Sequence, residues 1–338
     1  MRLFCTLLFL LTALAACSNA PEGLTLSPKW EAETLAEWHD ALPDMLAFSK
    51  DGKVLFISCE TPSNLLAPSL ARLDLASGKQ TILLYGLQRA DALKMAPDGS
   101  LWLGEEYPDG LIWKVESPLT LPAEQRIVRD SGKSSSRKIR PVTEAGAFAH
   151  EGIGFSDNGR TLYLADEWEE GGLFRYLLDT KKLQVLHAGK GWLPIIHPMD
   201  ARLESERLHA KRFARIEDMH VLPDGRILLA ETGNGGERGR ILVLDDRSEH
   251  PSVSDYFADA SLVHPDNLEW DAKRKWLWIT DDDSPSKLWA FDGKKLSLIA
   301  SHDDAEITGV AAAADGSIYF NLQHYRYGAD ATVRIHHR

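Results

Sequence analysis

Cysteine and long apolar runs are scarce in this sequence. Its 338 residues include three cysteines, at positions 5, 17 and 59, which is too few for a disulfide-stapled scaffold. Past the N-terminal segment, no apolar run approaches the roughly 20 residues that a membrane-spanning helix needs. With 44% hydrophobic and 26% charged residues, the remainder has the composition of an ordinary globular protein.

The chain is also short of positive charge. It has 38 Lys and Arg against 50 Asp and Glu, a net charge of −12, which excludes a nucleic acid held through its phosphates and suits cation binding. Two catalytic motifs are absent as well. There is no Gly-x-Ser-x-Gly nucleophile elbow, and Gly132-Lys133-Ser134 is not a phosphate-binding loop because Ile127 stands where that motif needs glycine.

The N-terminal residues have the pattern of an export signal. Arg2 precedes an apolar stretch that ends in Leu14-Ala15-Ala16-Cys17, which resembles the lipobox of bacterial lipoproteins. We therefore expect a signal peptide over residues 1–16 and lipidation at Cys17, so that a lipid anchor is the only membrane contact. Ser18, by analogy with such lipoproteins, favours the outer membrane, facing the periplasm or the cell surface. A plain signal peptide is the alternative.

Cys59 is then the single thiol of the folded body, because Cys5 leaves with the signal and Cys17 carries lipid. A lone thiol in an oxidising compartment is either buried and inert or has a task such as metal ligation. Inert burial is the favoured interpretation of Cys59.

A repeated unit runs through the chain. Six times, an apolar-alternating stretch, a tight turn and a second apolar run follow one another, with turns 42 to 66 residues apart. Asp-Gly and Asn-Gly turns between such stretches predict β-hairpins, since both turn residues tolerate positive φ. The turns are Asp51-Gly52, Asp98-Gly99, Asn158-Gly159, Asp224-Gly225, Lys273-Arg274 and Asp315-Gly316.

This spacing matches the blades of a β-propeller. We predict an all-β fold, a six-bladed β-propeller, with residues 17–39 as a tether or first strand and 40–338 as a single propeller domain. Two alternatives remain open: tandem β-sandwiches, and a seventh blade that would contain Trp30 to Trp38.

Acidic and amide side chains recur at both ends of each predicted hairpin. In a propeller, the start of each inner strand and the end of the next strand meet at the mouth of the central channel. The residues predicted to begin the inner strands, which we call openers, are Asp44, Asp91, Glu151, Glu217, Asp266 with Asn267, and Thr308. The residues predicted to end the second strands, which we call closers, are Glu60, Glu105 with Glu106, Asp166 with Glu167, Glu231, Asp281 with Asp282 and Asp283, and Asn321 with Gln323.

So many carboxylates at one mouth would repel each other unless cations lie among them. Oxygen ligands suit Ca²⁺, and iron is possible if a softer ligand joins. The predicted metal ligands are Glu60, Glu105, Glu151, Glu217, Asp266, Asn267 and Asp281. The nearby His150, His220, His264 and His324 are expected to support ligands rather than to bind metal, and Arg215 and Arg238 are the candidates for binding an anionic substrate.

Several short segments resemble PhoX-type alkaline phosphatases, in that family's order. They are His150-Glu151-Gly152, Leu164 to Glu167, Gly172 to Tyr176, Ile216-Glu217, Pro265 to Leu268, Asp281-Asp282 and Asn321 to His324. The resemblance implies a six-bladed propeller that hydrolyses phosphomonoesters with calcium and iron at the channel mouth. It implies ligand roles for Glu151, Glu217, Asp266 and Asn267, and it matches Glu60, Glu105 and Glu106 to acidic residues of the family.

The sequence departs from that family at Gly104, which stands where the family has an iron-ligating cysteine; Cys59 lies one blade earlier. The first hypothesis is therefore a metal-dependent phosphoesterase that acts on a small molecule, with Ca²⁺ favoured over iron. A calcium-dependent lactonase or arylesterase of the propeller type is the second. A non-catalytic binding or scaffold lipoprotein is the third.

Overall fold

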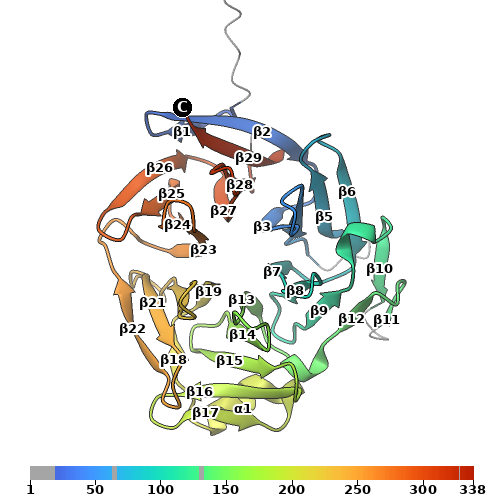
Figure 1. The fold of residues 1–338 in the computed structure, drawn as a ribbon, viewed down its shortest axis with the longest axis vertical. Helices are drawn as coiled ribbons and strands as arrows, with labels where there is room; N and C mark the ends of the chain where they lie inside the picture. The colour runs from blue at the N-terminus through green and yellow to red at the C-terminus, as the bar shows by residue number, and fades with distance from the viewer. Residues whose placement is uncertain (1–19, 63–66, 129–132, 327) are drawn as a thin grey trace, which may run out of the picture.

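Six small sheets stand in a ring around a central axis (Figure 1). The computed structural model describes residues 20–62, 67–128, 133–326 and 328–338. The predicted six-bladed β-propeller is confirmed. The predicted signal peptide and Cys17 lie outside the described residues. Within the described ranges, no helix has the length and apolar character needed to cross a membrane.

Each blade starts at the axis and proceeds outward in chain order, because short hairpins connect consecutive antiparallel strands. Blade 1 contains β3 (Pro43–Phe48), β4 (Val54–Cys59), β5 (Pro68–Asp74) and β6 (Gln80–Tyr85), extended by β10 (Gln125–Val128) and β11 (Lys133–Ser134). Blade 2 contains β7 (Ala90–Met95), β8 (Leu101–Glu105), β9 (Ile112–Val115) and β12 (Ile139–Pro141). Blade 3 contains β13 (His150–Phe155), β14 (Thr161–Asp166), β15 (Gly171–Leu177), β16 (Lys182–His187) and β17 (Gly191–Ile195), with β18 (Arg212–Phe213) paired to β15.

The second half of the ring repeats this plan. Blade 4 contains β19 (Ile216–Val221), β20 (Ile227–Glu231), β21 (Arg240–Asp245) and β22 (Ser252–Phe257). Blade 5 contains β23 (Pro265–Asp271), β24 (Trp276–Asp281), β25 (Ser286–Phe291) and β26 (Leu296–His302), with β1 (Leu24–Leu26) at its edge. Blade 6 contains β27 (Glu306–Ala312), β28 (Ile318–Gln323), β29 (Asp330–His337) and β2 (Trp30–Trp38).

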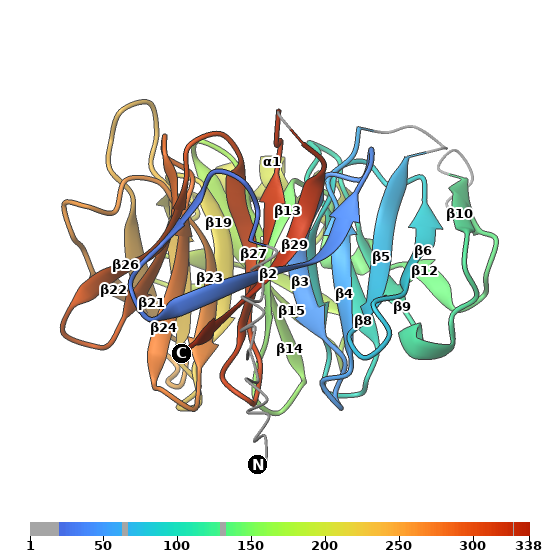
Figure 2. The same ribbon diagram turned by 90° about the horizontal axis from the view of Figure 1, so that it is seen from above.

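The ring is closed by pairing the first long strand with the last. β2 runs antiparallel to β29, from Trp30 opposite His337 to Trp38 opposite Asp330, and Figure 2 shows the two strands crossing together at the rim. Trp30 also packs edge-on against Trp278 of blade 5, with ring centroids 5.6 Å apart. The segment Trp30–Trp38 therefore completes blade 6, and a seventh blade is excluded.

The six predicted turns join the first and second strands of the six blades. The reason given from sequence was partly wrong, because in the five turns with a glycine only that glycine has positive φ, and in the Lys273-Arg274 turn the residue with positive φ is the next one, Lys275. Gly52 has φ 68°, and its N–H donates to the Ser49 carbonyl at 2.8 Å. The acidic side chain serves differently: Asp98 Oδ1 accepts the Ser100 N–H at 2.8 Å, which satisfies the turn backbone.

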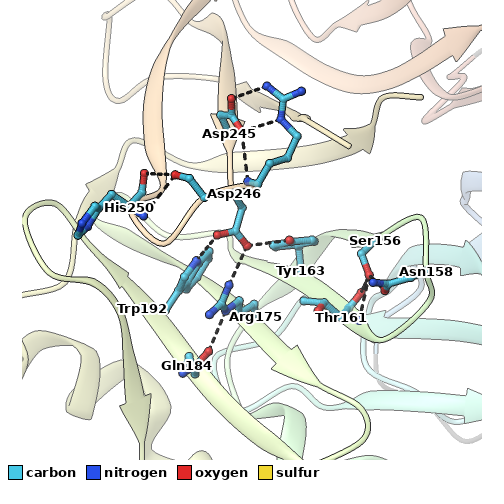
Figure 3. Close-up of polar contacts among 12 residues, drawn as sticks. Ser156, Asn158, Thr161, Tyr163, Arg175, Gln184, Trp192, Asp245, Asp246 and His250 are labelled. Carbon is cyan, nitrogen blue, oxygen red and sulfur yellow. Dashed lines mark hydrogen bonds and ion pairs between the residues drawn. The ribbon is translucent and has the colours of Figure 1, made fainter. Parts of the chain in front are cut away.

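A buried polar cluster joins blades 3 and 4 (Figure 3). Asp246, just after β21, is a common acceptor for Tyr163 Oη at 2.8 Å, Arg175 Nη1 at 2.8 Å and Trp192 Nε1 at 2.6 Å. The Arg175 guanidinium also lies over the Trp192 ring, 4.6 Å from its centroid. Because one carboxylate satisfies three donors of the neighbouring blade, its loss leaves them unpaired in a buried place.

Replacing Asp246 with alanine is expected to lower the free energy of unfolding by about 3 kcal/mol, the typical cost of removing one partner of a buried charged pair. The adjacent Asp245 is the matched control, because it pairs with Arg247 in solvent and surface ion pairs contribute little. Urea unfolding of the two alanine variants tests this. Equal effects of the two substitutions would contradict the assigned role of Asp246.

A candidate metal centre at the channel mouth

Five inner strands present a carboxylate at their second residue: Asp44, Asp91, Glu151, Glu217 and Asp266. In each of these strands the pairing register shifts directly after the first residue, as between Pro43 and Leu46 in β3. Such a β-bulge bends the strand and redirects the side chains beside it. The five bulges therefore aim five carboxylates into the mouth.

Blade 6 departs from this rule. Its register shift lies between Thr308 and Ala311, further along the strand, so the mouth-facing acid is Glu306. Thr308, the predicted opener, is buried and donates to Asp44 Oδ1 at 2.6 Å. It supports a carboxylate of the neighbouring blade instead of lining the cavity.

The predicted closers divide into two sets. Except in blade 6, the last residue of each second strand turns into its blade. Gln323, which ends β28, instead donates from Nε2 to Asp44 Oδ2 at 3.3 Å and to Glu60 Oε2 at 3.2 Å. Glu105 accepts the N–H of Gln88 at 2.9 Å and of Leu111 at 3.1 Å. Asp281 accepts the N–H of His264 at 2.7 Å and Trp289 Nε1 at 3.1 Å. The structure thus does not bring Glu105 or Asp281 to the cavity that was predicted for them.

The next residue along the chain faces the mouth, because side chains alternate along an extended chain. Glu60, Glu106, Asp282 and His324 occupy this place. The backbone N–H groups of Glu60, Glu106 and Asp282 donate to the start of their own blades, as where the Glu106 N–H donates to the Arg89 carbonyl at 2.9 Å. Glu60, Glu151, Glu217, Asp266 and Arg215 thus line the cavity as predicted from sequence.

The resulting cavity has a volume of about 490 Å³. Nine carboxylates, two arginines and two histidines line it, together with Thr232 and three glycines. The charged and imidazole side chains are Asp44, Glu60, Asp91, Glu106, Glu151, Glu217, Asp266, Asp282, Glu306, Arg89, Arg215, His264 and His324.

Two groups of three carboxylates are close enough to share a cation. Oxygens of Asp44, Glu60 and Asp91 lie within 4.8 Å of one another, and so do oxygens of Glu106, Glu151 and Glu167. We call Asp44, Glu60 and Asp91 the first triad, and Glu106, Glu151 and Glu167 the second triad. Carboxylate oxygens in such numbers are ligands that Ca²⁺ prefers.

Asp91 gives the strongest indication that the first triad holds a cation. Its side chain is 3% exposed, and Oδ1 has no hydrogen-bond partner. An unpartnered carboxylate oxygen is costly in a buried place. A cation among Asp44, Glu60 and Asp91 would supply the missing partner, so the donor set fits a hard divalent ion.

Two arginines offset part of the acidic charge. Arg89 contacts Glu60 through Nε at 2.7 Å and reaches Glu106 with Nη2 at 2.5 Å, so it joins the two triads. Arg215 contacts Glu167 through Nε at 2.5 Å and Glu217 through Nη2 at 2.9 Å. Sequence reasoning missed Arg89, although it immediately precedes an inner strand just as Arg215 does.

The electrostatics of the mouth favour protonated acids when no cation is present. Burial, followed by the Glu60 charge, raises the pKa of Asp44 to about 7. Burial, again followed by Glu60, raises the pKa of Glu106 to about 9. Burial raises the pKa of Glu217 to about 7, and burial together with neighbouring acids holds the pKa of Glu151 well above its ordinary value.

Asn267 and Arg238 lie apart from the cavity lining. The Asn267 amide oxygen accepts the Gly309 N–H, and its Nδ2 donates to Asp266 Oδ1 at 2.7 Å. Asn267 therefore orients Asp266 in this structure. Arg238 is exposed and donates to the Ala260 carbonyl.

No thiol reaches the cavity lining in the part of the chain that is described. Cys59 ends β4 and is fully buried in an apolar cluster, where burial raises the pKa of its thiol. A side chain at Gly104 would also collide, because an added Cβ would lie 2.6 Å from His150 Cβ and 2.8 Å from Ala92 Cβ. The position of the PhoX-type cysteine is thus closed here. His264 and His324, expected to play supporting parts, line the cavity themselves.

Comparison with known proteins extends the fold assignment. No family model and no curated protein matches the chain. Among solved structures, it is similar to a gluconolactonase from Xanthomonas campestris, with 11% identity, TM-score 0.58, and 93% of this chain and 91% of that chain covered. It is similar to a calcium structure of a Trichoderma reesei carbohydrate-active enzyme of family AA12, with 10% identity, TM-score 0.58, and 94% and 97% covered.

A PQQ-bound aldose sugar dehydrogenase from Streptomyces coelicolor is a third similar structure, with 12% identity, TM-score 0.57, and 92% and 99% covered. At these identities the likenesses show the fold alone. The similar structures agree with the assignment of this chain to the class of six-bladed β-propellers. The residues described above give this propeller an acidic channel mouth. None of these three structures is a PhoX-type phosphatase, so that resemblance stands on the sequence segments.

The raised pKa values predict how stability depends on pH. Without cations, the folded mouth binds more protons than the unfolded chain above about pH 4, so the free energy of unfolding falls as pH rises toward 9. Calcium binds the deprotonated form and stabilises the fold more at high pH. We expect Tm in EDTA to fall from pH 5 to pH 8, and the calcium-induced rise in Tm to be larger at pH 8. A rise in Tm that does not depend on pH would contradict this.

Asp91 and Glu105 give a matched pair of variants. Asp91→Asn is expected to lower calcium affinity by at least about tenfold, since it removes a ligand, yet to raise Tm in EDTA, because it removes a buried acid whose ionisation is opposed by burial and by neighbouring acids. Glu105→Gln is expected to lower Tm and leave calcium affinity unchanged. Calorimetric titration and thermal unfolding measure both effects, and loss of calcium binding in Glu105→Gln would reverse the assignment.

Proposed function

We propose that this protein is a calcium-dependent hydrolase of a small cyclic ester, a lactonase of the propeller type. The observation that carries the proposal is the first triad, in which a buried Asp91 oxygen lacks a partner at the centre of an acidic cavity. We further propose, from the N-terminal pattern, that the chain is exported and anchored through Cys17 at the outer membrane.

The similar structures support this choice over the phosphatase. Their names include a gluconolactonase, a sugar dehydrogenase and a calcium structure of a carbohydrate-active enzyme, and each of these names refers to a carbohydrate or a sugar-derived lactone. A cavity of about 490 Å³ accommodates a substrate of that size. Two arginines already paired with carboxylates leave little free positive charge for an anionic substrate.

The two triads would hold the cation, with Asp44, Glu60 and Asp91 as the first choice. When bound, a divalent cation polarises a carbonyl or phosphoryl oxygen and stabilises the charge that develops on it. Glu217 lies in the cavity outside both triads, and Arg215 Nη2 holds its Oε1 at 2.9 Å. We assign Glu217 the removal of a proton from the attacking water, because a general base works best with a pKa near the working pH, and burial raises the pKa of Glu217 to about 7.

A phosphomonoesterase is the second candidate, and a specific observation favours it. The two triads adjoin one another through Arg89, which contacts Glu60 of the first and Glu106 of the second. Two neighbouring cations would suit a phosphoryl group, whose transition state places charge on several oxygens. The PhoX-like segments around Glu151 and Glu217 point the same way, with calcium in both triads and iron disfavoured by the closed position at Gly104.

Hydrolysis of glucono-δ-lactone and of p-nitrophenyl phosphate by the calcium-loaded protein tests the two candidates. We expect lactone hydrolysis that EDTA abolishes and calcium restores, and kcat/KM at least about 100-fold lower in Asp91→Asn and Glu217→Gln. Glu105→Gln, which keeps the cavity lining intact, serves as the control. Phosphatase activity without lactone hydrolysis would reverse the ranking, and the absence of both activities in calcium-loaded protein would refute the hydrolase.

A further inference from the structure

An exposed tryptophan stands beside the acidic cavity. Trp168 follows Glu167, a member of the second triad, in the loop between β14 and β15. Its side chain is 48% exposed. Single exposed apolar residues are common on protein surfaces, so exposure alone assigns no role to Trp168.

What distinguishes Trp168 is that the fold holds it in place. Asp166, 1% exposed, accepts Arg202 Nε at 2.9 Å and Nη2 at 2.5 Å. Arg202 belongs to α1 (Ala201–Arg207), which follows β17 at the outer edge of blade 3 (Figure 1). Its guanidinium lies over the Trp168 ring, 4.5 Å from the centroid. A buried ion pair thus fixes an indole that leaves half of its surface in solvent.

The loop that contains Trp168 is hydrogen-bonded to the wall of the cavity. The Trp168 carbonyl accepts the N–H of Arg215 at 3.2 Å, and Arg215 lines the cavity. The adjoining wall contains Gly235 and Gly236, where an added Cβ would meet no atom within 4 Å. Asn234, the residue before these glycines, donates from Nδ2 to the Glu169 carbonyl of the Trp168 loop at 2.5 Å, so the loop adjoins a stretch of the wall that carries no side chain.

We propose that Trp168 is the platform on which a sugar ring of the substrate stacks. This inference rests on the proposed function. A sugar ring has an apolar C–H face that packs on an aromatic plane, and hydroxyl groups that donate to carboxylates. The arrangement here offers both surfaces together, a fixed indole at the rim and acceptor carboxylates inside. Trp168 is thus a specificity-determining residue that orients the ring toward the cavity.

The test uses the full calcium-loaded protein and glucose, a ring without a hydrolysable bond, as the probe. Trp168→Ala is expected to weaken glucose binding about tenfold, the effect of losing one good aromatic contact, and to raise KM for glucono-δ-lactone with kcat changed less than twofold. Trp168→Phe should restore most of the affinity. Trp192→Phe, at another indole covered by an arginine, should bind glucose like the wild type.

The outcomes separate this inference from the proposed function. Glucose binding that depends on Trp168 without any lactone hydrolysis would sustain the platform and refute the lactonase. Lactone hydrolysis with an unchanged KM and glucose affinity in Trp168→Ala would overturn the platform alone. Equal losses of glucose affinity in Trp168→Ala and Trp168→Phe, accompanied by a lower Tm, would show that Trp168 only shields the Asp166–Arg202 pair from solvent. Benzyl alcohol binding at Trp168 in place of glucose would overturn the sugar assignment.

Discussion

Repulsion among buried carboxylates at the axis is the constraint on which the rest of this molecule depends. Nine acids and two arginines share one cavity of about 490 Å³, and burial together with mutual repulsion raises the pKa values of many of these acids. The fold tolerates the arrangement because six hairpins and the β2–β29 pairing hold the ring closed from outside. The cost of ionising these acids thus lies at the axis, where a divalent cation would relieve it.

The way the carboxylates reach the axis follows from strand geometry. Each inner strand carries a bulge, and in five blades the bulge lies where it turns the opening acid inward. The acid that ends the second strand turns the other way and satisfies backbone and tryptophan donors inside its own blade, as Glu105 does. Acids next to each other in sequence therefore have opposite tasks: Glu105 stabilises a blade, and Glu106 lines the cavity.

Much of this could be predicted from sequence, and the failures have a physical pattern. The hairpin turns carry a local signal, so the six blades were identified, and Glu151, Glu217 and Asp266 were placed at the mouth. Glu105 and Asp281 were misplaced because an uncertainty of one residue at a strand end exchanges the two faces. Glu306 was missed because the blade 6 bulge lies further along the strand, at Gly309 with φ 65°, although a glycine inside a strand is a sequence sign of a bulge.

Contacts between residues distant in the chain account for the other differences between the sequence predictions and the structure. Arg89 and the Asp166–Arg202–Trp168 stack depend on residues distant in the chain, which no local motif reports. Gly104, noted in the sequence only as the absence of a cysteine, is explained by His150 and Ala92, which fill the space a side chain would need. The repeated hairpins thus conveyed the fold and the acidic mouth, whereas the contacts of individual residues decide which side chains reach it.

The most direct test of the account is an anomalous difference map from crystals of the protein grown with Mn²⁺ or a lanthanide in place of calcium. The account predicts a peak among the side-chain oxygens of Asp44, Glu60 and Asp91, with Asp91 Oδ1 as a ligand. A map that shows no ion at the mouth, with Asp91 Oδ1 bonded to a protein donor instead, would contradict it.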